Sequence, residues 1–198
     1  MNVQTNDKVV SFDDEQLILV DSDDRIVGYE SKASCHDGEG RLHRAFSVFL
    51  FDGEGRMLLQ QRSAEKRLWP MIWSNACCSH PRRNEEMDDA ARRRTREELG
   101  VEVEPEFLFK FQYHATYEDR GSENELCSVF IARCDEDPVT NVNEIHATRK
   151  LTIAELETEL AENGDHFSPW FKIEWKRLRE EYMDRIEGLW REGGAASA

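Results

Sequence analysis

Apolar residues alternate with polar ones along several short stretches of the chain, as they do in strands. Residues 15–20 (EQLILV) and 25–30 (RIVGYE) are joined by DSDD, which predicts a hairpin. Residues 45–51 and 56–61 repeat the pattern around the turn-forming residues 52–55, so we expect a longer hairpin in the core. FLFKFQYHA and LCSVFIARC are further predicted strands, separated by the polar segment TYEDRGSENE.

Two other segments have the spacing of helices. Residues 85–99 follow Asn84, a suitable N-cap, and precede Gly100, which favours the end of a helix. From Trp170 onward, apolar residues recur every three or four positions, which predicts an amphipathic helix packed on the sheet; they are Phe171, Trp175, Leu178, Tyr182, Ile186 and Leu189. Strands with one central helix and a helical end predict an α+β sandwich.

Length and composition indicate one domain. A chain of 198 residues that is 39% apolar can bury a single large core. We expect this domain to cover residues 15–192, with a flexible N-terminus over 1–14 and a flexible tail over 193–198.

Charge, hydropathy and cysteine content exclude several classes of protein. No apolar run approaches the roughly 20 residues of a membrane span, and the N-terminus has no signal-peptide pattern, so we expect a cytoplasmic protein without a membrane partner. A net charge of -15 disfavours a nucleic-acid partner. Five cysteines, an odd number, argue against a disulfide scaffold and favour reduced thiols. We expect a monomer.

The stretch WSNACCSHP, residues 73–81, contains the first candidate for chemistry. If it is extended, Cys78 and His80 share one face and Cys77 points to the other, because strand side chains alternate. The spacing of the cysteines does not fit a zinc knuckle, which needs cysteines two to four residues apart and a second pair elsewhere.

Carboxylates and imidazoles in separate segments form a second candidate. Glu123 and Glu125 are two residues apart, so in a strand both lie on one face and repel unless a cation lies between them. With His36, His43 and His80 they make a nitrogen and oxygen donor set suited to Mn²⁺ or Mg²⁺, or to Zn²⁺ with expanded coordination. Each histidine taken singly is an ordinary surface or core residue, so the prediction depends on the segments converging.

The predicted central helix contains charged residues at characteristic spacings. Glu85 is followed after seven residues by Arg93 and then by TREELG. This spacing resembles the end of the Nudix pattern, except that Arg94 stands where a metal-binding glutamate is expected and Ser79 where a glycine is expected. The segments RLHRAFSVFLF, LLQQRSAEKRLWPMIWSNACCSHP, RRRTREELGV, FQYHA, ENELCSVF and FSPWF together resemble the type I isopentenyl-diphosphate isomerases, from about residue 20 to residue 175. The resemblance implies a Nudix-type mixed β-sheet sandwich flanked by helices, with an N-terminal hairpin and a C-terminal helix.

The resemblance also implies a reaction and the residues that perform it. These enzymes interconvert isopentenyl and dimethylallyl diphosphate in isoprenoid biosynthesis, by adding a proton to one carbon and removing one from another through a tertiary carbocation-like state. Such a reaction needs an acid and a base on opposite sides of the substrate. Cys78 and Glu125 match that pair, Tyr113 matches a tyrosine that assists proton transfer, and Trp170 matches an aromatic residue that faces the cation. Which of the pair delivers the proton in each direction stays open.

Metal and substrate residues follow from the same resemblance. The family's His and Glu metal site matches His36, His43, His80, Glu123 and Glu125, and its diphosphate contacts match Lys32, Arg62, Lys66 and Arg94. Glu98 matches the ligand of a second ion, a Mg²⁺ that bridges to the diphosphate.

Two other functions are compatible with parts of this pattern. A Nudix hydrolase of nucleoside diphosphates would use Glu85, Glu97 and Glu98, but it lacks the glutamate at position 94 and leaves Cys78 without a role. A non-catalytic metal-binding domain would explain the His and Glu residues, but it gives no reason for the thiol beside them.

Overall fold

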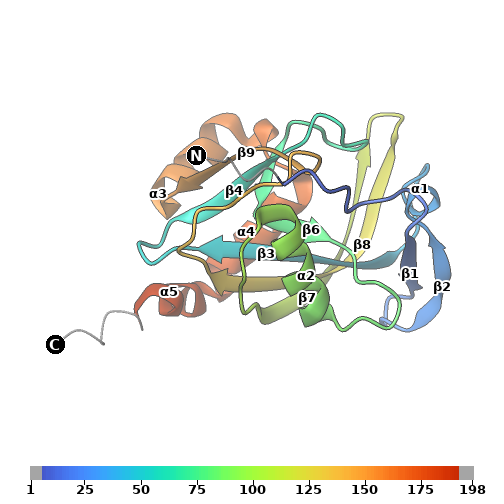
Figure 1. The fold of residues 1–198 in the computed structure, drawn as a ribbon, viewed down its shortest axis with the longest axis horizontal. Helices are drawn as coiled ribbons and strands as arrows, with labels where there is room; N and C mark the ends of the chain where they lie inside the picture. Colours follow the sequence, from blue (N-terminus) through green and yellow to red (C-terminus); the bar gives the residue numbers. More distant parts are fainter. Residues whose placement is uncertain (1–5, 192–198) are drawn as a thin grey trace.

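The computed structural model describes residues 6–191. Its strands are β1 (Gln16–Val20), β2 (Ile26–Ser31), β3 (His43–Phe51), β4 (Met57–Arg62), β5 (Trp73–Asn75), β6 (Cys77–Ser79), β7 (Glu106–Tyr117), β8 (Gly121–Arg133) and β9 (Ile145–Leu151). Its helices are α1 (Lys32–Cys35), α2 (Met87–Leu99), α3 (Ile153–Asn163), α4 (Pro169–Glu181) and α5 (Met183–Arg191), with a short 3-10 turn at Gly164–His166. Figure 1 shows the β1 and β2 hairpin at one end of the molecule and α3 and α5 at the other.

Strand β3 is the centre of a mixed nine-stranded sheet. It pairs in parallel with β8 along its whole length, and antiparallel with β6 on its other side. Strand β7 extends this part of the sheet beyond β8. Strand β4 pairs with β3 over only two residues. It pairs with β5 and β9 along the rest of its length, so the sheet divides into two branches.

Side chains of β3 alternate between two hydrophobic cores. Phe46, Val48 and Leu50 point toward one core, which α2 closes with its apolar face. Phe49 and Phe51 point toward the other core, which receives residues of α4 and α5 such as Phe171 and Ile186. The predicted α+β sandwich with helices on both sides is therefore confirmed, and it follows from the two-residue period of the strands.

The predicted strands are confirmed, whereas the helices differ from the prediction at several points. Helix α2 begins at Met87 after an N-cap at Glu86, so the prediction that Asn84 caps it is wrong; Asn84 instead has a φ of 62°, within a turn. Gly100 ends the helix in the left-handed conformation, as predicted. The predicted single C-terminal helix is two helices, because the backbone leaves helical geometry at Tyr182. Helices α1 and α3 and strand β9 were not predicted.

The polar segment between β7 and β8 is shorter than the sequence suggests. Only Glu118–Arg120 form the turn, and Gly121 begins β8, so Glu123 and Glu125 belong to the strand, where alternation directs both to one face. Gly121 has a φ of 140°, and a Cβ atom there would lie 2.1 Å from the carbonyl oxygen of His36. Glycine at this position therefore lets the segment carrying His36 approach β8.

Part of the segment expected to be loose makes specific contacts. Val10 is buried, its carbonyl accepts a hydrogen bond from Arg94, and Asn6 bridges to Asn141. The predictions of flexibility for residues 1–5 and for the tail over 193–198 lie outside the described residues. All five cysteines are free. Within residues 6–191, no helix is long and apolar enough to cross a membrane.

Candidate active site

Most of the predicted site residues line one cavity. Its volume is about 360 Å³, within the range of roughly 300–1,000 Å³ that small-molecule sites have. The predicted residues that line it are Lys32, His36, Arg62, Lys66, Cys78, His80, Arg94, Tyr113, Glu123, Glu125 and Trp170. His43 is fully buried against this group, and Glu98 is buried behind Arg94.

The register of the sheet explains why distant residues meet there. Cys78 is paired with Ser47 of β3, and Glu125 is paired with His43 of the same strand. Paired residues of adjacent strands point to the same face, so the thiol and the carboxylate reach the cavity from opposite sides of β3. Cys77 points into the core beneath α2, as strand alternation predicts.

Three imidazoles and a carboxylate converge on one point. One donor atom from each of His36, His43, His80 and Glu125 lies within 4.8 Å of the others. The Nδ1 atoms of His36 and His43 each lie 2.7 Å from a backbone carbonyl oxygen, so each Nδ1–H can donate there, which leaves Nε2 of each ring facing the group.

The contacts within this group fit a bound cation. Nε2 of His43 lies 3.2 Å from Nε2 of His80, and Nε2 of His36 lies 2.8 Å from a carboxylate oxygen of Glu123. Burial lowers the pKa of His80 well below its ordinary value, which keeps that ring neutral. Lone pairs and carboxylate oxygens this close together repel unless a proton or a metal ion lies between them, so the donor set suits a divalent ion.

Tyr113 and Trp170 complete the wall next to Glu125. The phenol of Tyr113 donates a hydrogen bond of 2.6 Å to Oε2 of Glu125. Burial alone would raise the pKa of Glu125, but His43 and Tyr113 outweigh it and the net pKa is lowered, so the group is a carboxylate. The ring centroids of Tyr113 and Trp170 are 6.2 Å apart, and the indole faces the cavity.

Cys78 offers the cavity a protonated thiol. Burial raises the pKa of Cys78 to about 12, so the sulfur keeps its proton near neutral pH. The thiol donates to Oδ1 of Asn75 over 2.9 Å. The site therefore holds a neutral acid and an ionised base in one cavity.

Basic residues gather at the other end of the cavity. Burial, together with the nearby charge of Lys66, lowers the pKa of Lys32 to about 8. The guanidinium of Arg62 donates 3.0 Å hydrogen bonds to the carbonyls of Leu68 and Trp69, which fixes its position over the ring of Trp170, with 5.3 Å between its Cζ and the ring centroid. Positive charge in a partly closed cavity suits an anionic group such as a diphosphate.

A buried carboxylate that the sequence analysis missed lies among these bases. Glu144 pairs with Lys66, and its Oε2 lies 3.5 Å from a guanidinium nitrogen of Arg94. Arg94 also donates to Glu98 over 2.6 Å, so Glu98 faces this arginine and does not line the cavity. Glu144 stands in NVNEIHA, which matches no pattern used for prediction, so only the structure could reveal it.

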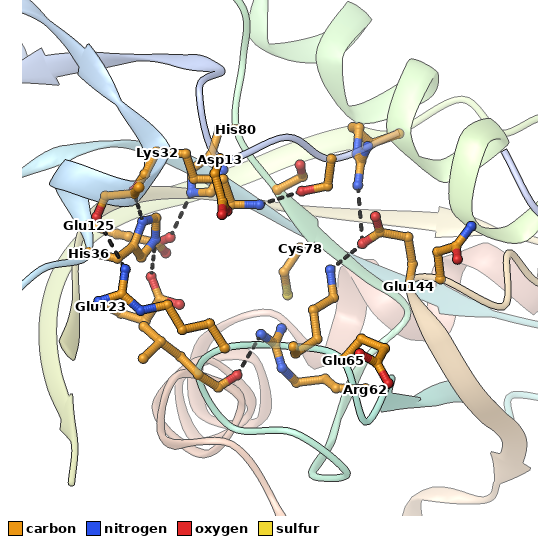
Figure 2. Close-up of a pocket in the computed structure, with 18 of the residues that line it drawn as sticks. Asp13, Lys32, His36, Arg62, Glu65, Cys78, His80, Glu123, Glu125 and Glu144 are labelled. Carbon is orange, nitrogen blue, oxygen red and sulfur yellow. Dashed lines mark hydrogen bonds and ion pairs between the residues drawn. The ribbon is translucent and has the colours of Figure 1, made fainter. Parts of the chain in front are cut away.

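Figure 2 shows the division of the site. His36, Glu123 and Glu125 lie on one side, Arg62 and Glu144 lie on the other, and Cys78 is between them. The predicted metal-binding and anion-binding groups thus flank the thiol.

Comparison with known proteins agrees with this geometry. Residues 41–171 match the family described as the NUDIX domain. The chain is 41% identical to "Isopentenyl-diphosphate Delta-isomerase 1" of Photorhabdus laumondii, over 87% of this chain and 99% of the relative. It is 42% identical to the protein of the same name from Aromatoleum aromaticum, again over 87% of this chain and 99% of the relative. The solved structure of DR0079 from Deinococcus radiodurans superposes with a TM-score of 0.62 at 25% identity, covering 75% of this chain and 90% of that one.

The fold and the matched domain define a Nudix protein. Within that class, the identity to the two relatives extends across nearly their whole length. The chain belongs to the isopentenyl-diphosphate Delta-isomerase family.

Proposed function

We propose that this protein interconverts isopentenyl diphosphate and dimethylallyl diphosphate, with Cys78 and Glu125 as the acid and base. The observation that carries the proposal is the placement of a neutral thiol and a carboxylate in one cavity, on opposite sides of β3. One of the two groups adds a proton to an alkene carbon, and the other removes a proton from a neighbouring carbon of the resulting cation.

Aromatic residues suit the cationic state between these two steps. The face of Trp170 stabilises a desolvated cation by about 2 kcal/mol or more. Trp69 packs edge-on against Trp170 at 5.3 Å, and both side chains are buried. This apolar wall excludes water, which would otherwise capture the cation as an alcohol.

Lys32, Arg62, Lys66 and Arg94 are the proposed contacts of the diphosphate. Lys66 now pairs with Glu144, so the substrate has to compete with this carboxylate for the lysine. Arg94 at the position of a Nudix glutamate supports this role over hydrolysis, because a guanidinium cannot bind a catalytic metal and does attract phosphate.

Two metal sites belong to the proposal. His36, His43, His80, Glu123 and Glu125 would hold a Mn²⁺, Mg²⁺ or Zn²⁺ ion, which supplies positive charge that fixes Glu125 and lowers its basicity. Glu98 is the proposed ligand of a Mg²⁺ that bridges to the diphosphate; such an ion would compete with Arg94 for the carboxylate. We further propose a cytoplasmic monomer with no membrane or nucleic-acid partner.

The test is incubation with isopentenyl diphosphate and Mg²⁺ in deuterated water, followed by NMR. Deuterated dimethylallyl diphosphate is expected. Released phosphate from a nucleoside diphosphate would favour hydrolysis, and metal binding without turnover of either substrate would favour a binding domain.

Cys77 provides a matched control for the thiol. Cys78→Ala is expected to abolish isomerisation and leave metal content intact, whereas Cys77→Ala, which changes the neighbour on the opposite face, should retain activity. Near-normal turnover of Cys78→Ala would refute the acid and base pair.

A further inference from the structure

Glu174 is a buried carboxyl group without a counter-charge. It lies on α4, one turn after Trp170, and is fully buried. The other buried acidic side chains within residues 6–191 each face an arginine, lysine or histidine; they are Asp52, Glu98, Glu123, Glu125 and Glu144. Among the same residues, Glu174 forms no ion pair, and its Oε2 has no hydrogen-bond partner.

This environment keeps Glu174 neutral. An ionised carboxylate without a cation or a full set of donors is very costly to bury, so the group holds its proton instead. Burial accordingly raises the pKa of Glu174 to about 8. The polar groups beside it are the thiol of Cys127, whose sulfur lies 3.5 Å from Oε1, and the hydroxyl of Ser47.

Hydrogen bonds connect Glu174 to Cys78. The amide nitrogen of Asn75 donates to the carbonyls of Val48 and Cys77, so Oδ1 of Asn75 faces Cys78 and accepts the thiol proton. The sulfur of Cys78 then has only lone pairs left. Its other partner, 3.5 Å away, is Oγ of Ser47, which must therefore be the donor.

Oγ of Ser47 also lies 3.5 Å from the sulfur of Cys127, which lies 3.5 Å from Oε1 of Glu174. Because Ser47 gives its single proton to Cys78, the thiol of Cys127 donates to Ser47, and the proton of the neutral carboxyl group is the one that Glu174 donates to the sulfur of Cys127. The chain from Glu174 to Cys78 therefore passes through residues of β8 and β3. None of its members needs to be charged for these contacts to form.

We propose that Glu174, as a neutral carboxylic acid, is a positioning residue that orients the thiol of Cys78 through Cys127 and Ser47. The inference rests on the proposed role of Cys78. Because the carboxyl group acts without ionising, a glutamine should replace it and an alanine should not.

Steady-state kinetics separate this role from simple packing. Glu174→Ala is expected to lower kcat by about 3- to 10-fold with little change in KM, the loss that one neutral hydrogen bond accounts for. Glu174→Gln should restore most of that kcat. Ser47→Ala should resemble Glu174→Ala, and the double variant should lose no more than either single one, because both changes break one chain.

Leu178→Ala is the matched control for the cavity that Glu174→Ala leaves. Leu178 is one turn further along α4 and fully buried in the same core, but has no polar group. Its variant should lose stability and keep kcat at a temperature where all variants are folded. An equal loss of kcat in Leu178→Ala would overturn the proposal in favour of a packing effect.

Infrared spectroscopy tests the protonation state without turnover. The wild-type protein at neutral pH should show a protonated-carboxyl C=O band that Glu174→Gln lacks. Absence of that band, or a Glu174→Gln variant as slow as Glu174→Ala, would refute a neutral positioning role. If Cys78→Ala is fully active, the proposed acid and base pair fails; if Cys78→Ala is inactive and Glu174→Ala is unimpaired, only the present inference fails.

Discussion

Replacing Arg94 by methionine should strongly destabilise the protein. Arg94 is buried between Glu98 and Glu144, which are also almost fully buried. Removing one partner of a buried ionic group leaves the others uncompensated and typically costs about 3–5 kcal/mol. For a chain of this size each kcal/mol corresponds to about 2–4 °C in Tm, so a drop of roughly 6–20 °C is expected.

The stability lost in Arg94→Met should be smaller at low pH than at high pH. Burial already raises the pKa of Glu98, whereas Lys66 and Arg94 outweigh burial and lower the pKa of Glu144. Without Arg94 the pKa of Glu98 rises further above its value in the unfolded chain, and the pKa of Glu144, which keeps its pair with Lys66, rises as well. The folded state then binds more protons, so stability falls as pH rises and the deficit of the variant shrinks in acid.

Thermal unfolding at about pH 5 and about pH 8 would test this argument. Arg96→Met is the matched control. Arg96 is two positions after Arg94 on the same helix, but it is exposed and pairs with Glu102 at the surface. Its loss should leave Tm unchanged within error. The double variant Arg94→Met/Glu98→Met should recover part of the loss, since it also removes one unpaired carboxylate. Equal Tm values for Arg94→Met and Arg96→Met at both pH values would refute this explanation.

Three further predictions concern the site. Glu123→Gln should weaken Mn²⁺ binding in calorimetry, whereas Glu65→Gln, on the same cavity but outside the histidine group, should not; equal binding by both would remove Glu123 from the site. Tyr113→Phe should lower kcat by about tenfold or more, because a hydrogen bond to a charged group is worth roughly 1.5–3 kcal/mol; unchanged kcat would show that the phenol plays no part. Gly121→Ala should lower both Tm and Mn²⁺ affinity, because its Cβ would collide with the carbonyl of His36; a wild-type Tm would contradict that.

Local patterns in the sequence determined the strands and the faces of the site. Alternation along WSNACCSHP was enough to assign Cys77 and Cys78 to opposite faces of the strand. The same rule assigned Glu123 and Glu125 to one face. Gly100 marked the end of α2 correctly, because a left-handed residue there carries a clear signal. Such features depend on backbone geometry over a few residues.

Helix boundaries without a strong local signal were less predictable. The spacing of apolar residues continues through Tyr182, where the helix breaks, because α4 and α5 bury residues in the same core. Asn84 has the chemistry of an N-cap but lies in a turn before Glu86. In both cases the local sequence pattern alone does not decide where the helix begins or ends.

Only the tertiary structure revealed the partners of the buried charges. Glu144 belongs to a segment without a recognisable motif and Glu174 lies on the predicted C-terminal helix, but the properties of both arise from neighbours far away in the chain. Glu144 meets Lys66 and Arg94 and is ionised, while Glu174 meets a thiol and a hydroxyl and is neutral. The protonation state of a buried carboxyl group is set by what the fold places within a few ångströms of it, which the sequence of its own segment does not contain.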